Sequence, residues 1–247
     1  MTFGVIMYVF QERFIFQSST LAEGYRFNFG IPVQEYDLEL SNGNINMIHF
    51  KVDSSKGCIL YFHGNAGDLS KWGEVVKPLL TLGYDIMLMD YRGYGKSKGE
   101  RIEKEMYQDA IMAYEKAKEY FKEEEIIVYG RSLGSTFATW VAANHSPKKL
   151  ILETPFYSLK SVVKGKFPYL PVDQMLEYNF DTHKFYSNVK CPIVFFHGNE
   201  DGVVSYNNGQ RLFARSKNAR FVTFPRGGHN DLMRFQLYWE NMKREFK

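Results

Sequence analysis

The sequence predicts an α/β fold, in which helices cover both faces of a mostly parallel sheet. Apolar runs of strand length alternate along the chain with longer segments of helical period, which is the pattern that parallel strands with helical crossovers produce. The chain has 247 residues, of which 45% are hydrophobic. A single domain over residues 1–247 can therefore bury a large core.

The predicted strands begin with a hairpin. Residues 34–40 and 46–52 alternate in polarity around SNGN at 41–44, a sequence typical of a tight turn. The later strands are short apolar runs, as expected for strands that are buried on both faces. They are residues 58–62, 85–89, 126–129, 150–152, 193–196 and 221–224.

Helical periodicity fills most of the intervals between the later strands. The predicted helices are residues 69–82, 102–121, 132–143, 206–214 and 231–245. The interval between residues 152 and 193 is different, because it is long and rich in Phe, Tyr, Leu and Pro. Long excursions in compact domains tend to be lids or binding loops, so we expect residues 156–188 to form a small cap.

Composition and charge exclude several classes of protein. The chain has 31 basic and 28 acidic residues and a formal charge of +3, which is too balanced for a nucleic-acid-binding protein. Cys58 and Cys191 each open an apolar run, so we expect buried thiols, with a redox pair as the alternative. Buried thiols fit a cytoplasmic protein. The histidines show no metal-ligand spacing, so no metal is expected.

The N-terminus is a hydrophobic segment, residues 1–16. Its apolar run, residues 2–10, is too short to cross about 30 Å of hydrocarbon as a helix. It also lacks the basic region and the cleavage site of a signal peptide. We expect this segment to pack on the domain. A contact with a membrane surface, or the remainder of a membrane anchor, is the alternative.

The first chemical motif is GRSLG at 130–134, which follows a predicted strand and opens a predicted helix. In that setting G-x-S-x-G forms a sharp turn that exposes a nucleophilic serine, here Ser132. Glycines are needed two residues before and after, because side chains there would clash across the bend. The alternative is that Ser132 simply caps the helix.

A serine nucleophile needs a general base and an acid that orients the base. His229 follows one apolar strand, and Asp201 follows another. The order Ser132, Asp201, His229 is the order that enzymes with this serine turn use. Glu200 is the alternative acid, and a structural hydrogen bond is the alternative role of His229.

Acyl transfer also needs hydrogen-bond donors for the oxyanion that develops on the substrate. We expect the main-chain N–H groups of Leu133, directly after the serine, and Asn65, in the loop after the strand 58–62. Gly64 and Gly67 allow the backbone of that loop to approach a ligand closely. His63 is expected to brace the loop from a buried position.

Five motifs, in this order, together resemble the α/β-hydrolase superfamily. The branch that they resemble most is the esterase and acyl-protein thioesterase-like group, whose members often carry an N-terminal membrane helix. The motifs are HGNAGD at 63–68, DYRGYGKS at 90–97, GRSLG at 130–134, HGNED at 197–201 and GGHN at 227–230.

The resemblance extends from about Phe14 to the C-terminus. It implies an eight-stranded, mostly parallel sheet whose second strand is antiparallel, and it implies no cofactor. Two departures stand out. VVS at 203–205 replaces a sequence in which relatives usually have proline, and no N-terminal membrane helix is visible, which leaves membrane attachment open. DYRGYGKS has the glycine spacing of neither a P-loop nor a dinucleotide site, and we expect it to brace the floor of the site.

The predicted function is a serine hydrolase that cleaves carboxylic esters or thioesters through an acyl-enzyme intermediate. We expect a small-molecule or lipid-like acyl substrate with a short to medium chain, bound by apolar side chains of the cap. The alternatives are a catalytically idle binding protein and a peptidase on the same fold. The substrate-binding residues expected in the cap are Phe156, Tyr157, Phe167, Tyr169 and Leu170.

Overall fold

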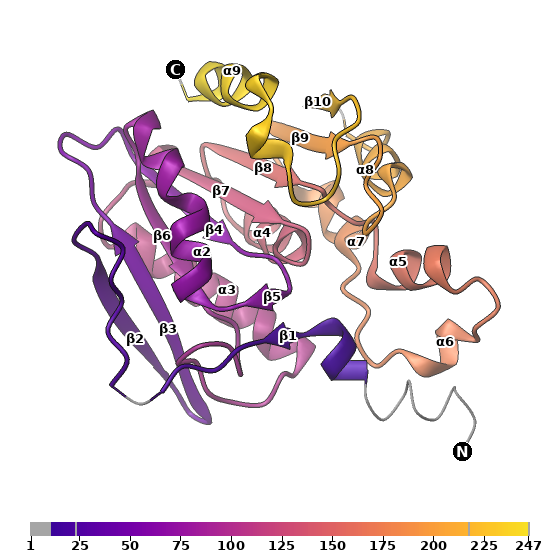
Figure 1. Ribbon diagram of the computed structural model, residues 1–247, viewed down its shortest axis with the longest axis horizontal. Coiled ribbons are helices and arrows are strands. Elements are labelled where there is room, and N and C mark those ends of the chain that lie inside the picture. Colours follow the sequence, from indigo (N-terminus) through magenta and orange to yellow (C-terminus); the bar gives the residue numbers. More distant parts are fainter. Residues whose placement is uncertain (1–10, 23, 217, 247) are drawn as a thin grey trace.

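One sheet runs through the centre of the computed structural model, which describes residues 11–22, 24–216 and 218–246 (Figure 1). Its eight strands lie in the order β10-β9-β8-β7-β4-β6-β3-β2. Their bounds are β2 Gln34–Leu40, β3 Gly43–Phe50, β4 Cys58–Phe62, β6 Asp85–Met89, β7 Ile126–Arg131, β8 Lys149–Glu153, β9 Ile193–Gly198 and β10 Ala219–Phe224.

The direction of the strands confirms the predicted fold class. From β6 to β10, every neighbouring pair in the sheet is parallel. β3 is antiparallel to both of its neighbours, β2 and β6. The hairpin at the start of the chain therefore supplies the one reversed strand of this sheet. A separate pair, β1 (Gln17–Ser18) and β5 (Ala66–Gly67), joins the N-terminal segment to the loop after β4.

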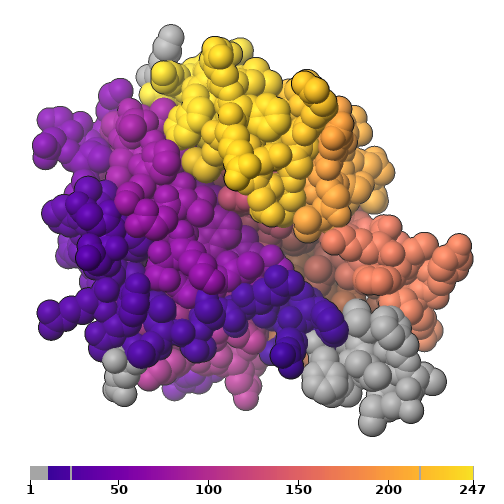
Figure 2. Space-filling view, viewed as in Figure 1, coloured from indigo at the N-terminus to yellow at the C-terminus, as the bar shows by residue number. Residues whose placement is uncertain are grey.

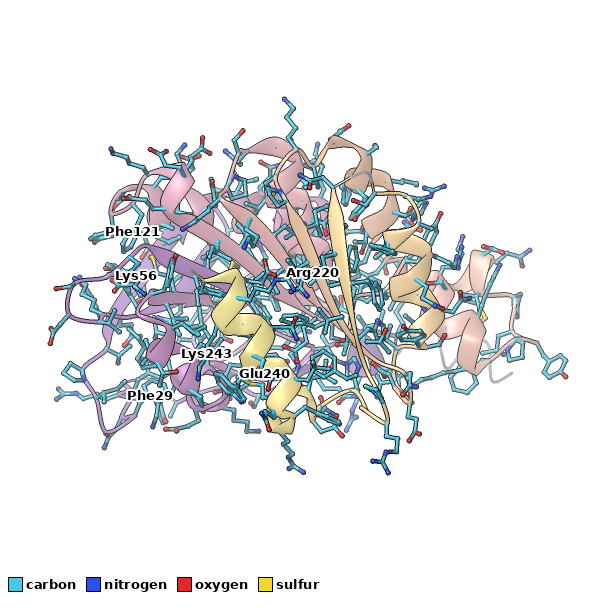
Figure 3. The ribbon with its side chains drawn as sticks, turned by 90° about the horizontal axis from the view of Figure 1, so that it is seen from above. Phe29, Lys56, Phe121, Arg220, Glu240 and Lys243 are labelled. Carbon is cyan, nitrogen blue, oxygen red and sulfur yellow. The ribbon has the colours of Figure 1, made fainter. Side chains whose placement is uncertain are left out.

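Helices cover both faces of this sheet, as predicted. On one face α2 and α9 pack over a cluster that includes Phe29, and on the other α3 and α4 pack over a cluster that Phe121 borders. Figure 3, seen from above, shows Phe29 and Phe121 on opposite sides of the sheet. The helices are α2 Leu69–Val76, α3 Glu103–Lys118, α4 Gly134–Asn144, α8 Tyr206–Phe213 and α9 Gln236–Glu245.

Two predicted helices are each divided into a 3₁₀ segment and an α-helix. The helix predicted at 69–82 changes to a 3₁₀ helix, η1 (Lys77–Leu82), where Pro78 has no N–H to offer the preceding turn. Gly83, at φ 80°, ends that segment. The helix predicted at 231–245 begins with η4 (Leu232–Arg234), and α9 starts only at Gln236.

The excursion between β8 and β9 contains three short helices, none of which is among the predicted helices. They are α5 Leu159–Lys166, α6 Val172–Met175 and α7 Thr182–Phe185, followed by the 3₁₀ turn η3 (Tyr186–Asn188). α7 and η3 pack on α4, whereas α5 and α6 project from the body of the molecule (Figure 1). Both helices lie within residues 156–188, the segment for which a small cap is expected.

The N-terminal segment lies beside the cap. Residues 11–15 form a helical turn, and the main-chain N–H of Glu177 donates a 2.8 Å hydrogen bond to the side chain of Gln11. The apolar run at residues 2–10 lies outside the described residues. Among those that are described, no helix is long and apolar enough to span a membrane. Cys58 and Cys191 are both free and buried, as expected for small apolar side chains.

Candidate active site

The candidate site lies at the carboxyl edge of the sheet, where the chain changes direction. Along the chain β4 is followed by β6 on one side, whereas β7 is followed by β8 on the opposite side. The loops after β4 and β7 therefore diverge, and such a point leaves a crevice in α/β sheets. The loop after β4 carries Asn65, and the turn after β7 carries Ser132.

Ser132 lies in a strained turn. Its φ of 50° is in the left-handed region, which is unfavourable for a residue with a side chain. Its main-chain N–H is held by a 2.9 Å hydrogen bond to the carbonyl of Glu153. The flanking glycines have no room for a side chain, because a Cβ on Gly134 would lie 2.0 Å from the carbonyl oxygen of Phe62. One on Gly130 would lie 2.5 Å from the Cβ of Ala138.

Gly134→Ala is therefore expected to destabilise the protein. Its Cβ would clash with main-chain atoms, which cannot move away as a flexible side chain can. We expect the free energy of unfolding to fall by about 1–3 kcal/mol or more. Gly165→Ala is the matched control, since nothing lies within 4 Å of that Cβ and alanine favours a helix. Thermal unfolding should show a lower Tm for the first and an equal or higher Tm for the second. Equal Tm values for wild type and Gly134→Ala would contradict the packing of this turn.

Ser132, His229 and Asp201 form one hydrogen-bonded chain. The Oγ of Ser132 lies 3.0 Å from Nε2 of His229, and Nδ1 of His229 lies 2.7 Å from Oδ2 of Asp201. A carboxylate only accepts hydrogen bonds, so Nδ1 carries a proton, and in the neutral imidazole the lone pair is then on Nε2. That tautomer can accept the proton of the serine hydroxyl.

Asp201 is built as a fixed carboxylate. Its Oδ1 accepts hydrogen bonds of 2.8 Å from the N–H groups of Val203 and Val204, and its Oδ2 lies 3.3 Å from Nε2 of the buried His197. Burial opposes the charged form, but the hydrogen bonds from His197 and His229 outweigh it and hold the pKa of Asp201 well below its usual range. Glu200, the alternative acid, is exposed.

Val203 and Val204 bind Asp201 through main-chain N–H groups. The absence of proline at position 205 therefore leaves these contacts intact. Ser205 precedes α8 without a side-chain cap, so the departure from the family pattern concerns the start of that helix.

The expected oxyanion donors border the space in front of Ser132. Asn65 and Leu133 line the same pocket as Ser132. His63 is fully buried, and its Nδ1 lies 2.7 Å from the carbonyl oxygen of Gly64. The carbonyl and the N–H of a trans peptide point in opposite directions, so this contact turns the N–H of Asn65 away from His63. His63 thus braces the loop by fixing that peptide plane.

The loop at 90–97 holds the Asn65 loop from behind. The hydroxyl of Tyr91 donates to the carbonyl of His63 at 2.7 Å, and that of Tyr94 donates to the carbonyl of Asn65 at 2.8 Å. Both tyrosines are buried, and burial raises their pKa values, so the hydroxyls stay protonated and remain donors. The loop thus holds the floor of the site in place.

An apolar pocket of about 450 Å³ opens beside Ser132. In Figure 2 the surface is hollowed between the main body and the salmon-coloured residues of the cap. Of the five substrate-binding residues expected in the cap, Phe156 and Phe167 line this pocket. Leu170 lines a smaller apolar recess next to it. Tyr169 is 98% exposed, and Tyr157 stacks on His183 at 4.2 Å, so neither tyrosine faces the pocket.

Much of the pocket wall comes from residues that the sequence did not indicate. Leu159, Val162 and Val163 of α5 have the spacing i, i+3 and i+4, which is a helical signal in the sequence. Phe14 and Ile15 come from a distant part of the chain, and no local pattern indicates that they line this pocket. The additional apolar side chains are Phe14, Ile15, Leu159, Val162, Val163, Val203 and Val204.

Lys166 is the one charged residue in the pocket wall among the described residues. Within that part of the chain, no group of three or more His, Cys, Asp and Glu side chains could hold a metal ion. The hydroxyl, the imidazole, the carboxylate and the main-chain donors described above are the groups that meet at Ser132.

Comparison with known proteins identifies relatives. A model of the family described as serine aminopeptidase, S33 matches residues 53–172. An uncharacterized protein of Mycobacterium tuberculosis is 33% identical, over 70% of this chain and 63% of that protein. The lysophosphatidylserine lipase ABHD12 of Danio rerio is 31% identical, over 69% of this chain and 51% of the lipase. The chain thus spans between about half and two thirds of these relatives.

The fold is shared with a solved esterase of Pyrococcus furiosus. The two structures superpose with a TM-score of 0.73 over 94% of this chain and 96% of the esterase, at 17% sequence identity. At that identity the likeness concerns the arrangement of strands and helices.

Proposed function

This chain belongs to the α/β-hydrolase superfamily, and from that premise we propose that it is a serine hydrolase of carboxylic esters or thioesters. The observation that carries the proposal is the hydrogen-bonded chain of Ser132, His229 and Asp201 beside an apolar pocket. A nucleophile, a base and an orienting acid in this contact can perform acyl transfer when donors for the oxyanion lie beside them.

The proposed reaction has two halves. Ser132 Oγ attacks the acyl carbon while His229 Nε2 takes its proton, and His229 then returns that proton to the leaving alcohol or thiol. Asp201 holds the imidazole in its tautomer and stabilises the imidazolium. The N–H groups of Leu133 and Asn65 hold the oxyanion. Water then attacks the acyl-enzyme by the same path and releases the acid.

We propose that residues 156–188 act as a small cap and that the acyl chain lies in the apolar pocket. Phe156 contributes to the wall from the start of the cap, and Val163 contributes from α5. Phe167, which is 44% exposed, stands where the wall meets solvent. An uncharged acyl group fits these surroundings, since binding sites of this kind are mostly apolar with few polar groups.

The dependence on acyl length follows from this pocket. Each buried CH₂ should contribute about 0.8 kcal/mol, or about fourfold in kcat/KM, until the chain leaves the wall. We expect kcat/KM for p-nitrophenyl esters to rise from acetate and to peak at short to medium chains. Val163→Phe should move the peak to shorter chains. Lys164→Phe, the same bulk at an exposed neighbour outside the pocket, should not. A rise that continues to palmitoyl esters would contradict a short pocket.

A peptidase is the second candidate, because the matching family is described as serine aminopeptidase. An aminopeptidase must bind a substrate ammonium group, and burying a cation without a partner is costly. Among the described residues the pocket wall contains no carboxylate, and its one charge is the cation of Lys166. These features favour an uncharged acyl group.

One assay separates these candidates. The chain is supplied with p-nitrophenyl esters, acyl-CoA thioesters and amino-acid p-nitroanilides in parallel. Turnover of esters or thioesters with no release from the anilides is the expected result. Preference for the anilides would establish the peptidase, and no turnover of any of them would favour an idle binding protein.

A further inference from the structure

Arg131, the residue before the serine, makes a buried ion pair. Its side chain is 7% exposed, and its Nε lies 3.2 Å from Oε1 of Glu153, the last residue of β8, which is 2% exposed. Glu153 also accepts a hydrogen bond from the hydroxyl of Tyr129. The main chain of Glu153 holds the N–H of Ser132. Both members of the pair thus touch the serine turn. Arg131 is part of it, and the carbonyl of Glu153 accepts the N–H of Ser132.

The same guanidinium group reaches the loop that carries His229. One Nη of Arg131 donates to the side-chain oxygen of Asn230 at 2.9 Å and to the carbonyl oxygen of His229 at 3.3 Å. Arg131, which directly precedes Ser132, is therefore hydrogen-bonded to the main chain of His229. Ser132 and His229 are 97 positions apart in the sequence. The side chain of Arg131 links the two segments that carry them.

Arg131 also contacts the loop of Asn65, through a tryptophan. The guanidinium lies over the ring of Trp72 at 5.2 Å. Trp72 donates to the carbonyl of Ala66 at 2.7 Å, and a Cβ on Gly64 would lie 3.2 Å from its ring. A single buried cation thus touches the serine turn, the histidine loop and the side chain that supports the oxyanion loop.

A buried ion pair of this kind is weak evidence of a gain in stability. Taking two charges out of water is costly, and well-packed apolar residues often replace a buried ion pair with no loss of stability. The planar guanidinium group has five N–H donors in a fixed geometry, so it can hold several acceptors in defined directions at once. The acceptors here are the carboxylate of Glu153 and two oxygens of the histidine loop.

We propose that Arg131, held by Glu153, is a positioning residue that sets the imidazole of His229 against the hydroxyl of Ser132. The inference rests on the proposed function. It predicts that a change at Arg131 lowers kcat and leaves KM nearly unchanged, because Arg131 does not line the acyl pocket. Displacement of a catalytic group by 1 Å can cost about 10²-fold in rate.

The first test is Arg131→Lys, which keeps a cation beside Glu153 but lacks the fork that reaches the histidine loop. We expect kcat for a p-nitrophenyl ester to fall by about 10-fold or more, with KM within about twofold and a Tm close to that of wild type. Lys149→Met is the matched control. It removes a partly buried ion pair with Glu245 at the opposite end of the same strand, β8, and kcat should stay at the wild-type value.

The second test separates positioning from charge pairing. Arg131→Met leaves the Glu153 carboxylate buried without its cation, so its Tm should fall. The double variant Arg131→Met/Glu153→Gln removes both charges, and we expect its Tm to recover while kcat stays low. Recovery of kcat together with the Tm would show that Arg131 only neutralises Glu153 and would overturn the proposal.

A readout without turnover distinguishes this proposal from the proposed function. The proton on Nδ1 of His229, held by Asp201, should give a downfield ¹H NMR resonance that disappears in His229→Ala. In Arg131→Lys it should shift or broaden, and in Lys149→Met it should not. If the wild type were inactive and Arg131→Lys still shifted or broadened this resonance, only the proposed function would be contradicted. An unchanged resonance and an unchanged kcat in Arg131→Lys would overturn the positioning role.

Discussion

Replacing Ser132 by alanine is expected to lower ester hydrolysis by roughly 10⁴-fold or more. The hydroxyl is the proposed nucleophile, and its Oγ is the atom that faces Nε2 of His229 at 3.0 Å. Residual turnover would come from the oxyanion donors and the pocket, which the substitution leaves in place. The loss should appear in kcat, measured with the best p-nitrophenyl ester.

The fold of the Ser132→Ala variant should remain intact, because its methyl group fits within the space of the serine side chain. Near-UV circular dichroism and the Tm should match those of wild type. Ser41→Ala, an exposed serine in the turn between β2 and β3, is the matched control and should retain full activity. A Ser132→Ala variant that keeps more than about a tenth of the wild-type rate would exclude Ser132 as the nucleophile.

The second large effect is expected at Asp201. Asp201→Asn replaces the carboxylate beside Nδ1 of His229 with an amide of the same shape. The amide favours the wrong imidazole tautomer. The same Asp-to-Asn change in a Ser-His-Asp triad costs on the order of 10⁴-fold in kcat. Glu200→Gln is the matched control, since it makes the same chemical change on an exposed neighbour, and it should be mild.

The two acid variants can be compared directly by their kcat values at one pH. The pKa of Asp201 lies well below its usual range, so this carboxylate is charged at neutral pH in the wild type and in Glu200→Gln. If Glu200→Gln were the severe variant and Asp201→Asn the mild one, the acid would be Glu200.

The sheet could be predicted because buried strands appear as unbroken apolar runs. The runs at 58–62 and 85–89 coincide with β4 and β6 in the structure. β7 and β8 extend further than predicted, to Arg131 and Glu153. These two charged residues are register partners in the sheet, and a charge in the sequence does not reveal the partner that allows its burial.

The residues of the candidate site could be located for a topological reason. Ser132, Asp201 and His229 each follow a buried strand, and the carboxyl ends of parallel strands meet at one edge of the sheet. Their positions after β7, β9 and β10 bring them together. The contact of Arg131 with the histidine loop was not visible in the same motif, because G-x-S-x-G leaves the second position unspecified.

The cap shows the limit of composition as a guide. Its aromatic content correctly indicated buried apolar surface, but not which side chains are buried. Phe167 lines the pocket while Tyr169, two positions away, is 98% exposed. Short helices take their orientation from packing against distant segments, here of α7 against α4, and a local pattern holds no information on that packing.

The measurement that tests the central claim most directly is covalent labelling of the folded wild-type protein with a fluorophosphonate. This reagent reacts with a serine that an adjacent base activates. Mass spectrometry of the intact chain and then of its peptides reports the number and the position of adducts. We expect one adduct, on the peptide that contains Ser132, and none in Ser132→Ala. A folded wild-type protein that takes up no label, or that takes it up at another serine, would contradict the account.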